Sequence, residues 1–305
     1  MTLSELIQKA RKVAPERYLL ALLFLFALGL GYFAWRMLPR PLEVTSFAVG
    51  DGDAFLIRSP AGRAILIDGG SRTVNDVGKQ VLVPNLYLLG VRKLDAIIIT
   101  HPDADHLNGL PAVLAAIPVG MLLTGDGYSD STPFQQVMSI AAERKVPLQH
   151  IHAGEELNLG GGAKLKVLAP GVELLRNTGA DDNNNSVVTR LDYRNTRMLF
   201  TGDLETAGEQ ALLAQPRELR ADVLKVAHHG SAHGSIDPFL EAVKPSYALI
   251  SAAGNADHPN PKVLERMRAR QITPWRTDVL GRIILTTSGN GWREQHYRSE
   301  AVAGR

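Results

Sequence analysis

The chain has 305 residues, of which 45% are hydrophobic and 21% are charged, and its formal net charge is +2. This composition is that of an ordinary globular protein, so it excludes wholesale disorder. The chain contains no cysteine, which excludes a disulfide framework, iron–sulfur chemistry and thiolate catalysis. A metal ion would therefore have to be held by His, Asp, Glu or Asn.

The positive charge is concentrated at the N-terminus. Residues 1–40 contain six basic and two acidic side chains, whereas residues 41–305 contain 27 basic and 29 acidic ones. A strong nonspecific nucleic-acid binder carries its positive charge on the folded domain. The charge distribution therefore does not favour this class of function for the main part of the chain.

Residues 18–35 form an uncharged apolar run. As a helix this run would be about 27 Å long, close to the roughly 30 Å of a bilayer's hydrocarbon core. Tyr18, Tyr32 and Trp35 stand near its ends, where aromatic rings favour the membrane interface. A buried core helix would show a polar face, and a cleavable signal peptide would show small residues at its exit. Neither feature is present, so we predict a transmembrane anchor at 18–38.

The basic residues that flank this run predict its orientation. Four of them precede it and two follow it. Because positive flanks tend to stay in the cytoplasm, we expect residues 1–17 to be cytoplasmic. The rest of the chain would then lie in the periplasm or outside the cell, as part of a single-pass protein of the bacterial inner (cell) membrane.

After residue 41 the sequence changes to short apolar runs separated by Gly, Asp and Asn, which are typical of strands and tight turns. Segments with apolar residues at helical spacing alternate with them. We predict one α/β domain at 42–295, with two sheets and outer helices, and a loose tail at 296–305. In chain order, the expected strands cover 44–49, 54–58, 64–67, 95–100, 120–124, 186–193, 197–201, 221–227, 247–251 and 282–287, with short strands between 145 and 168, and the expected helices cover 77–89, 107–116, 133–144, 206–214, 238–243 and 261–270.

The densest chemical signal is the segment 101–106, which follows an expected apolar strand. His101, Asp103, Asp105 and His106 supply four candidate ligands within six residues. Mixed imidazole and carboxylate ligands suit Zn²⁺, Mn²⁺ or Fe²⁺. A solvated acidic turn is the alternative, but two His and two Asp interleaved after a buried strand favour a site for two cations.

Three further polar groups follow apolar strands. Asp203 has an oxygen for each of two metal ions, although it could instead cap the next helix. His228 and His229 form a pair beside a glycine, which is an unusual choice for a purely structural strand end. Asp68 is either a turn residue or a support for a His ligand, and we favour the second interpretation. Because α/β proteins place ligands at the carboxyl ends of strands, we expect these groups to converge.

The segment His101-x-Asp103-x-Asp105-His106 resembles the metal motif of the metallo-β-lactamase superfamily, in which His usually stands at the position of Asp103. The variant with Asp resembles the extracellular hydrolase domain of ComEC-type DNA-uptake (competence) proteins, and the resemblance covers about residues 43–288. The other segments that carry it are Val49–Ala54, Asn184-Asn185-Ser186, Thr201-Gly202-Asp203, His228-His229-Gly230-Ser231, His258-Pro259 and Arg276-Thr277-Asp278.

The sequence also departs from the family pattern. Ala48 and Asp51 stand where the opening turn usually has Asp and Gln. The superfamily's third His is missing, and Asp182 or one of residues 183–185 occupies its region. We expect the first metal site to be weaker, or to be completed by an amide oxygen or a water molecule. ComEC proteins carry a multi-helix channel, whereas one span is predicted here, so this chain is not expected to form the channel.

The resemblance implies a four-layer αβ/βα sandwich with a dinuclear site for two divalent ions, Zn or Mn. The implied metal ligands are His101 and Asp103 for one ion, Asp105, His106 and His228 for the other, and Asp203 as the bridge. The implied catalytic residues are Asp105 and His229, with His229 protonating the leaving oxygen or binding phosphate. The implied substrate contacts are Asn185, Ser186, Ser231 and His258, and Asp68 supports a His ligand.

The leading hypothesis is a membrane-anchored, metal-dependent phosphodiesterase or nuclease that acts on extracytoplasmic DNA. Single-stranded DNA is its candidate substrate and a DNA-uptake machinery its candidate partner. One alternative is a hydrolase of another ester or amide, such as a phosphocholine ester or a lactam. Another is a non-catalytic accessory subunit of a DNA-uptake or envelope complex. Asp103 favours phosphodiesters, because lactam hydrolases of this fold mostly have His at that position.

Overall fold

The computed structural model describes residues 15–37, 40–127, 131–215, 218–255 and 257–297. The chain separates into two compact units, Met1–Arg40 and Pro41–Arg305. In the first unit the described residues form the helix α2 (Pro15–Met37). None of the helices in the described ranges combines the length and hydropathy needed to span a membrane. Most of the predicted cytoplasmic segment 1–17 lies outside the described residues.

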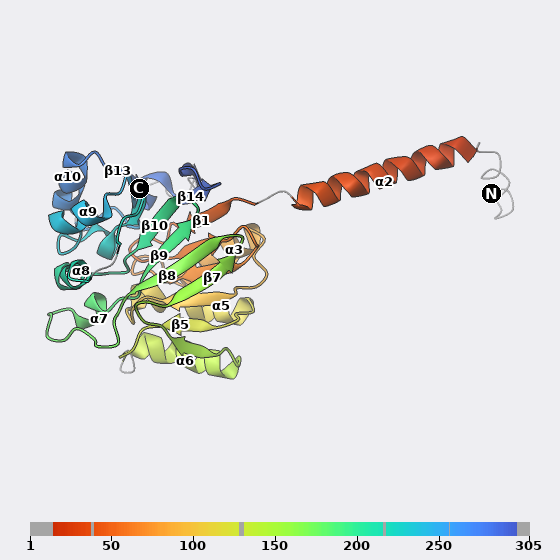
Figure 1. Cartoon of the computed structure of the whole chain (residues 1–305). Helices are drawn as coiled ribbons and strands as arrows, with labels where there is room; N and C mark the ends of the chain where they lie inside the picture. The colour runs from red at the N-terminus through yellow and green to blue at the C-terminus, as the bar shows by residue number, and fades with distance from the viewer. Residues whose placement is uncertain (1–14, 38–39, 128–130, 216–217, 256, 298–305) are drawn as a thin grey trace. The chain divides into compact units, whose positions relative to one another are not determined.

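The first sheet of the larger unit has eight strands in the order β15-β14-β1-β2-β3-β4-β5-β6 (Figure 1). β3 to β6 run parallel to one another, and the other neighbours pair antiparallel. All four residues of β3 and of β4 are buried and apolar, as expected for parallel strands covered on both faces. The strands are β1 Leu42–Ser46, β2 Phe55–Arg58, β3 Ala64–Ile67, β4 Ala96–Ile99, β5 Leu122–Thr124, β6 Leu148–His150, β14 Arg282–Thr287 and β15 Arg293–Tyr297.

The second sheet has seven strands in the order β13-β12-β11-β10-β9-β8-β7. β10 to β13 are parallel, and β7 to β10 form an antiparallel meander. The hairpin expected at 186–201 is present as β9 and β10. The strands are β7 Glu156–Gly160, β8 Ala163–Ala169, β9 Val188–Tyr193, β10 Thr196–Phe200, β11 Val223–Lys225, β12 Tyr247–Ile250 and β13 Thr273–Arg276.

Three apolar clusters hold four layers together. The central cluster lies between the sheets, where the rings of Phe55 and Phe200 meet with centroids 5.6 Å apart. One outer cluster joins the first sheet to α3, α5 and α6, and the other joins the second sheet to α8, α9 and α10. The predicted two-sheet α/β sandwich is thus confirmed. The helices of this unit are η1 Gly78–Leu82, α3 Val83–Leu88, α4 Ala104–Leu107, α5 Leu110–Ala116, α6 Thr132–Glu143, α7 Asp181–Asn184, α8 Thr206–Leu213, η2 Ala227–Gly230, α9 Asp237–Val243, α10 Pro261–Ala269 and α11 Thr277–Leu280.

The C-terminal strands differ from the expected ones. The strand 282–287 was expected to be the last, but β15 pairs antiparallel with it, so residues 296–297 of the predicted loose tail belong to the sheet. β15 is a polar, largely exposed edge strand, and β13 is mostly exposed and contains Pro274. Edge strands need backbone pairing on one side only and can lack an apolar alternation, so neither was expected. Residues 298–305 lie outside the described part of the chain.

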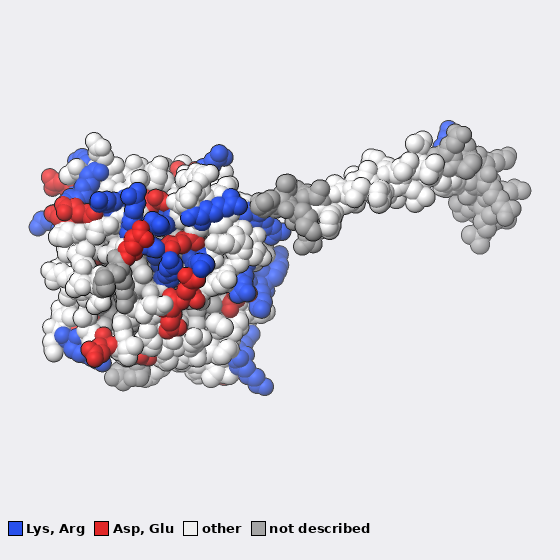
Figure 2. All heavy atoms as spheres, in the orientation of Figure 1, with Lys and Arg blue, Asp and Glu red and all other residues white. Residues whose placement is uncertain are grey.

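The surface of this unit carries both charges. On the face drawn in Figure 2, basic and acidic side chains are intermixed. Ion pairs join Lys164 to Glu156 and Lys166 to Asp192 across strands β7, β8 and β9. This pattern agrees with the absence of a strong excess of positive charge in residues 41–305.

Candidate metal centre

The polar residues of the site follow parallel strands of both sheets. β3 and β4 lead into Asp68 and the segment 101–106, whereas β10 and β11 lead into Asp203 and the pair His228–His229. The carboxyl ends of neighbouring parallel strands lie at one edge of a sheet. As a result, groups 124 positions apart in sequence meet, and His229 Nε2 lies 3.3 Å from Asp105 Oδ2.

The metal motif lies partly on a helical turn. A helix was expected from residue 107, but α4 begins at Ala104, and Asp103 stands at its N-cap position. Asp105 and His106 are therefore neighbours on one helical turn instead of residues of an open loop. Both side chains are buried, as is His101, while Asp103 is partly exposed.

Asp68 orients both histidines of this segment. Its Oδ2 lies 2.9 Å from His106 Nδ1 and accepts a hydrogen bond of 2.7 Å from the Thr100 hydroxyl. Because that hydroxyl proton is directed at Asp68, Thr100 Oγ1 accepts from His101 Nδ1 at 3.0 Å. Burial alone would lower the pKa of His106, but the charges of Asp203 and Asp68 raise it well above its usual range in the metal-free structure. With a metal ion bound, both imidazoles would keep their proton on Nδ1 and present Nε2 as a ligand atom. Nε2 of His101 and of His106 are buried and make no hydrogen bond in the described structure.

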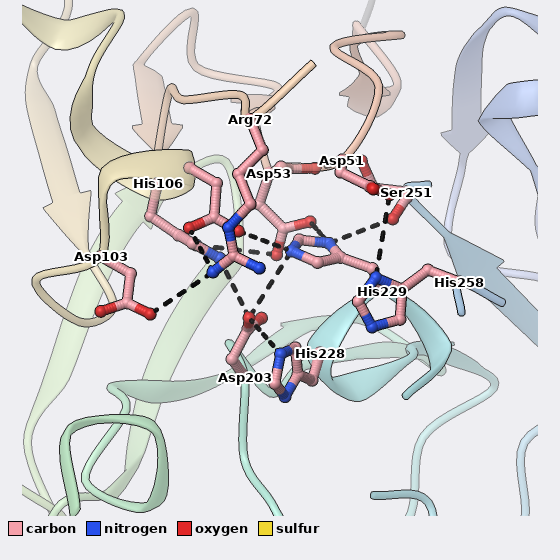
Figure 3. Close-up of polar contacts among 12 residues, drawn as sticks. Asp51, Asp53, Arg72, Asp103, His106, Asp203, His228, His229, Ser251 and His258 are labelled. Atoms are coloured by element: carbon pink, nitrogen blue, oxygen red, sulfur yellow. Dashed lines mark hydrogen bonds and ion pairs between the residues drawn. The ribbon is translucent and has the colours of Figure 1, made fainter. Parts of the chain in front are cut away.

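Four buried side chains converge as one candidate ligand set: Asp105, His106, Asp203 and His229. Asp203 Oδ2 lies 3.3 Å from His106 Nε2 and 3.5 Å from His229 Nε2 (Figure 3). Tetrahedral ligands with bonds of about 2.0–2.1 Å stand roughly 3.3–3.4 Å apart. The spacing of these nitrogen and oxygen atoms therefore fits a divalent metal ion among them.

A second group shares Asp203. His101 Nε2 lies 3.8 Å from Asp103 Oδ2 and 3.9 Å from Asp203 Oδ2. The same oxygen of Asp203 thus faces both groups, as a bridging ligand would. Burial, and then the nearby charge of His106, hold the pKa of His101 well below its usual range, so its imidazole is neutral and able to bind a metal ion.

The backbone of the pair His228–His229 directs the two imidazole rings to different places. Both residues have left-handed backbone angles, with φ of 49° for His228 and 52° for His229, a conformation that is strained in residues with a side chain. His229 Nδ1 donates to Ser251 O at 3.1 Å, which directs Nε2 to the ligand set. His228 Nε2 lies farther out, 3.9 Å from Asp203 Oδ2, and its Nδ1 faces Glu205. The buried candidate set thus contains His229, while His228 lies as far from this Asp203 oxygen as His101 does.

Two charged groups beneath the site were missed in the sequence. Lys225 is 1% exposed, forms an ion pair with Asp53 and donates to Gly202 O at 2.8 Å. Burial alone would raise the pKa of Asp53, but the charges of Lys225 and His229 keep it below its usual value. The sequence signal for this ion pair is a lysine inside the apolar strand β11, because a fully buried lysine needs a carboxylate partner.

Asp203 is held from two sides. Its backbone N–H donates to Ser186 Oγ at 3.2 Å, and its Oδ1 lies 3.4 Å from Lys225 Nζ. The hydroxyl of Ser186 thus accepts from the backbone of Asp203, and its predicted contact with substrate stays a prediction. Burial alone would raise the pKa of Asp203, yet the charges of His106 and His229 hold it well below its usual range.

The other predicted substrate contacts lie in different places. The amide of Asn185 bonds to the backbone of Leu175 and Asp181, so it holds a loop and is not directed at the ligand set. Ser231 Oγ accepts from His233 N at 3.3 Å. The ring of His258 lies 5.5 Å from that of His228, at the rim of the site. A contact of His258 with substrate at this rim stays a prediction.

The missing third histidine has no replacement among the neighbouring amides. Asn184 Oδ1 accepts from the backbone of Glu205 and Gly208, and its Nδ2 donates to Thr178. Asn185 is engaged as described, and Asp182 is exposed. The amides of Asn184 and Asn185 are thus engaged elsewhere, and the expectation of a weaker first site, or of a water or amide ligand there, stays a prediction.

A comparison with known families decides the classification of the chain. The model of the metallo-beta-lactamase superfamily matches residues 48–254. The chain belongs to this superfamily. A zinc-bound PqqB from Methylobacterium extorquens has a similar fold, with a TM-score of 0.53 at 13% identity over 77% of this chain and 97% of that chain.

Among curated proteins, this metallo-beta-lactamase chain is similar to two competence-related proteins. It is 30% identical to the ComE operon protein 3 of Bacillus subtilis over 82% of its own length and 34% of that protein. It is 32% identical to the competence protein ComA of Neisseria gonorrhoeae over 91% of its length and 39% of that protein. The chain thus spans between a third and two-fifths of the length of these relatives.

Proposed function

We propose that this chain is a metal-dependent hydrolase that cleaves phosphodiesters, with extracytoplasmic DNA as its physiological substrate. The observation that carries the proposal is the position of Asp203 Oδ2 between two candidate ligand groups. Divalent ions bound there would polarise phosphoryl oxygens and acidify a water molecule. The carboxylate-rich ligand set, with Asp103 where lactam hydrolases of this fold mostly have His, supports Zn²⁺ or Mn²⁺ and a phosphodiester substrate.

The protein's own residues would bind the substrate and move the proton. His229 is oriented by Ser251 and serves as a ligand, so the proton donor to the leaving oxygen is assigned to His228. Its side chain is 15% exposed, and its Nδ1 lies 3.3 Å from Glu205 Oε1, which would keep the proton on Nδ1 or replenish it. His258, whose ring faces His228 at the rim, would contact the substrate beside the scissile bond.

The test uses the full chain, purified in detergent and loaded with Mn²⁺ or Zn²⁺. We expect hydrolysis of bis-p-nitrophenyl phosphate and of single-stranded DNA, abolished by Asp105→Asn. Hydrolysis of a lactam or a phosphocholine ester without phosphodiester cleavage would favour the second hypothesis. Two bound metal ions without turnover of any of these substrates would favour an accessory subunit of a DNA-uptake or envelope complex.

Membrane anchoring through α2 is part of the same proposal. The apolar side chains of this helix are exposed, for example Leu20 at 65% and Phe26 at 66%, and its central residues 18–35 carry no charge. Resistance to carbonate extraction would support an anchor, and digestion of the domain by protease in spheroplasts would support a periplasmic location. Release by carbonate would count against the anchor.

A further inference from the structure

Arg72 connects the buried site to solvent. Its Nη2 lies 3.1 Å from Asp105 Oδ1 and 3.8 Å from Asp103 Oδ2, while half of its side chain is exposed. Figure 3 shows its guanidinium directed toward the ligand set from above. The other described cation paired with the site carboxylates, Lys225, is only 1% exposed and lies beneath them. Of the two, Arg72 alone can reach an incoming ligand.

The backbone that carries Arg72 is held rigidly against the site. Arg72 N donates to Asp51 O at 2.6 Å, and Gly70 N donates to Asp53 O at 3.1 Å. Next to it, Ser71 N donates to the side chain of Asn108 at 3.0 Å. The base of the side chain is thus fixed, and its flexible length allows the guanidinium to move between the carboxylates and a ligand above them.

The donor chemistry of Arg72 suits an anionic oxygen. A guanidinium has five N–H donors in a plane, and this fork matches phosphate geometry. The described contacts of Arg72 with carboxylates involve Nη2. No other described residue bonds to its Nε or Nη1, so these donors remain for a ligand.

The charge of the site favours the same role. Five carboxylates surround it, and the Lys225 ammonium leaves four negative charges, which two divalent ions would neutralise. Arg72 then adds one positive charge at the opening. A phosphodiester carries one negative charge that this guanidinium attracts, whereas a neutral ester or lactam carries none.

From these observations we propose that Arg72 binds a nonbridging oxygen of the phosphoryl group and selects anionic substrates. This inference rests on the proposed phosphodiesterase function. Its Nη2 would remain near Asp105, and its other donors would face the substrate. Arg72 would thus be a specificity-determining residue on the solvent side of the ligand set.

The experiment compares wild type, Arg72→Ala and Arg72→Lys as full-length chains in detergent with Mn²⁺. Arg270→Ala is the matched control, because Arg270 also pairs with two carboxylates, Asp237 and Glu241, but outside the site. Three quantities are measured: bound metal per chain, the affinity for inorganic phosphate by calorimetry, and kcat/KM for bis-p-nitrophenyl phosphate. None of them requires knowledge of the natural substrate.

We expect Arg72→Ala to retain the metal content of wild type and to bind phosphate about 10- to 100-fold more weakly, which is the range for a charge-assisted contact. The phosphate affinity of Arg72→Lys should lie between those of wild type and Arg72→Ala, and that of Arg270→Ala should match wild type. Phosphate affinity within about twofold of wild type, or loss of metal as the main effect of Arg72→Ala, would overturn the inference.

The design separates this inference from the proposed function. A wild type that binds phosphate through Arg72 but hydrolyses no phosphodiester would contradict the function and retain the anion site. A wild type that hydrolyses phosphodiesters with unchanged kcat/KM and phosphate affinity in Arg72→Ala would retain the function and contradict the role of Arg72.

Discussion

Lys225 Nζ lies 3.4 Å from Asp203 Oδ1, and 1% of each side chain is exposed. The other oxygen of this carboxylate, Oδ2, faces His101, His106 and His229. The buried ammonium thus holds one oxygen and leaves the other for metal ions. Lys225 is therefore a permanent cation built into the floor of the site.

Replacing this cation should destabilise the fold. Lys225→Met leaves Asp53 and Asp203 buried without their partner, and breaking a buried pair on one side costs about 3–5 kcal/mol. Urea unfolding of the metal-free protein measures this loss. The double variant Asp53→Asn/Lys225→Met removes both members of one pair, so it should recover part of the stability. A single variant as stable as wild type would contradict the importance of this pair.

Asp68→Asn should weaken metal binding with little change in fold. The amide cannot match the carboxylate as acceptor for both His106 and Thr100, and loss of such a partner typically lowers metal affinity by about 10- to 100-fold. Competition with a chromogenic chelator measures the affinity. Asp95→Asn is the matched control, since Asp95 accepts a backbone hydrogen bond from Ala64 away from the site. Equal affinities in the two variants would argue against the orienting role.

The two adjacent histidines should behave differently. His229→Ala removes a member of the ligand set, so we expect it to lose one metal ion per chain by elemental analysis. His228→Ala should keep both ions and lose most of its turnover of bis-p-nitrophenyl phosphate. The opposite pattern, with metal loss in His228→Ala alone, would restore the assignment made from the sequence.

Glu209 should make stability depend on pH. Burial raises its pKa to about 7, although its oxygens accept from Ser235 N and Ile236 N. Because the folded-state pKa lies above the unfolded value of 4.5, the folded chain binds the proton more tightly. Protonated Glu209 therefore adds on the order of a few kcal/mol to the free energy of unfolding. This contribution is fully present below pH 4.5 and is lost as the pH rises to about 7.

The comparison of wild type with Glu209→Gln isolates this effect from other titrating groups. The difference between their unfolding free energies should change between pH 4.5 and 7 in the direction that weakens wild type, and it should be constant above pH 8. A difference independent of pH over this range would show that Glu209 titrates normally.

Removal of metal should lower the thermal stability. An ion at 100 times its dissociation constant stabilises the folded state by about 2.7 kcal/mol, which corresponds to a shift in Tm of roughly 5–10 °C for a domain of this size. Scanning calorimetry with and without a chelator measures it. The shift should be smaller in Asp105→Asn, and an unchanged Tm in wild type would argue against a resident metal ion.

Much of the fold and the composition of the candidate site follow from local patterns. The apolar runs of β3 and β4 predicted buried strands, and the density of His and Asp in 101–106 indicated a metal site at the end of one of them. The position of Asp68 after β3 predicted its support of a histidine. Such inferences are possible because strand ends and ligand types are properties of a few consecutive residues.

Only the tertiary structure decided which side chains face one another. The placement of His229 rather than His228 in the buried candidate set depends on two left-handed backbone angles. Adjacent residues of the same type have no sequence signal that separates them. The partnership of Asp53 with Lys225 joins the turn before β2 of the first sheet to β11 of the second. The turn of Asn185 toward a loop depends on contacts with backbone outside its own segment. A sequence specifies which groups stand at the ends of strands, whereas the direction of each group depends on packing against distant parts of the chain.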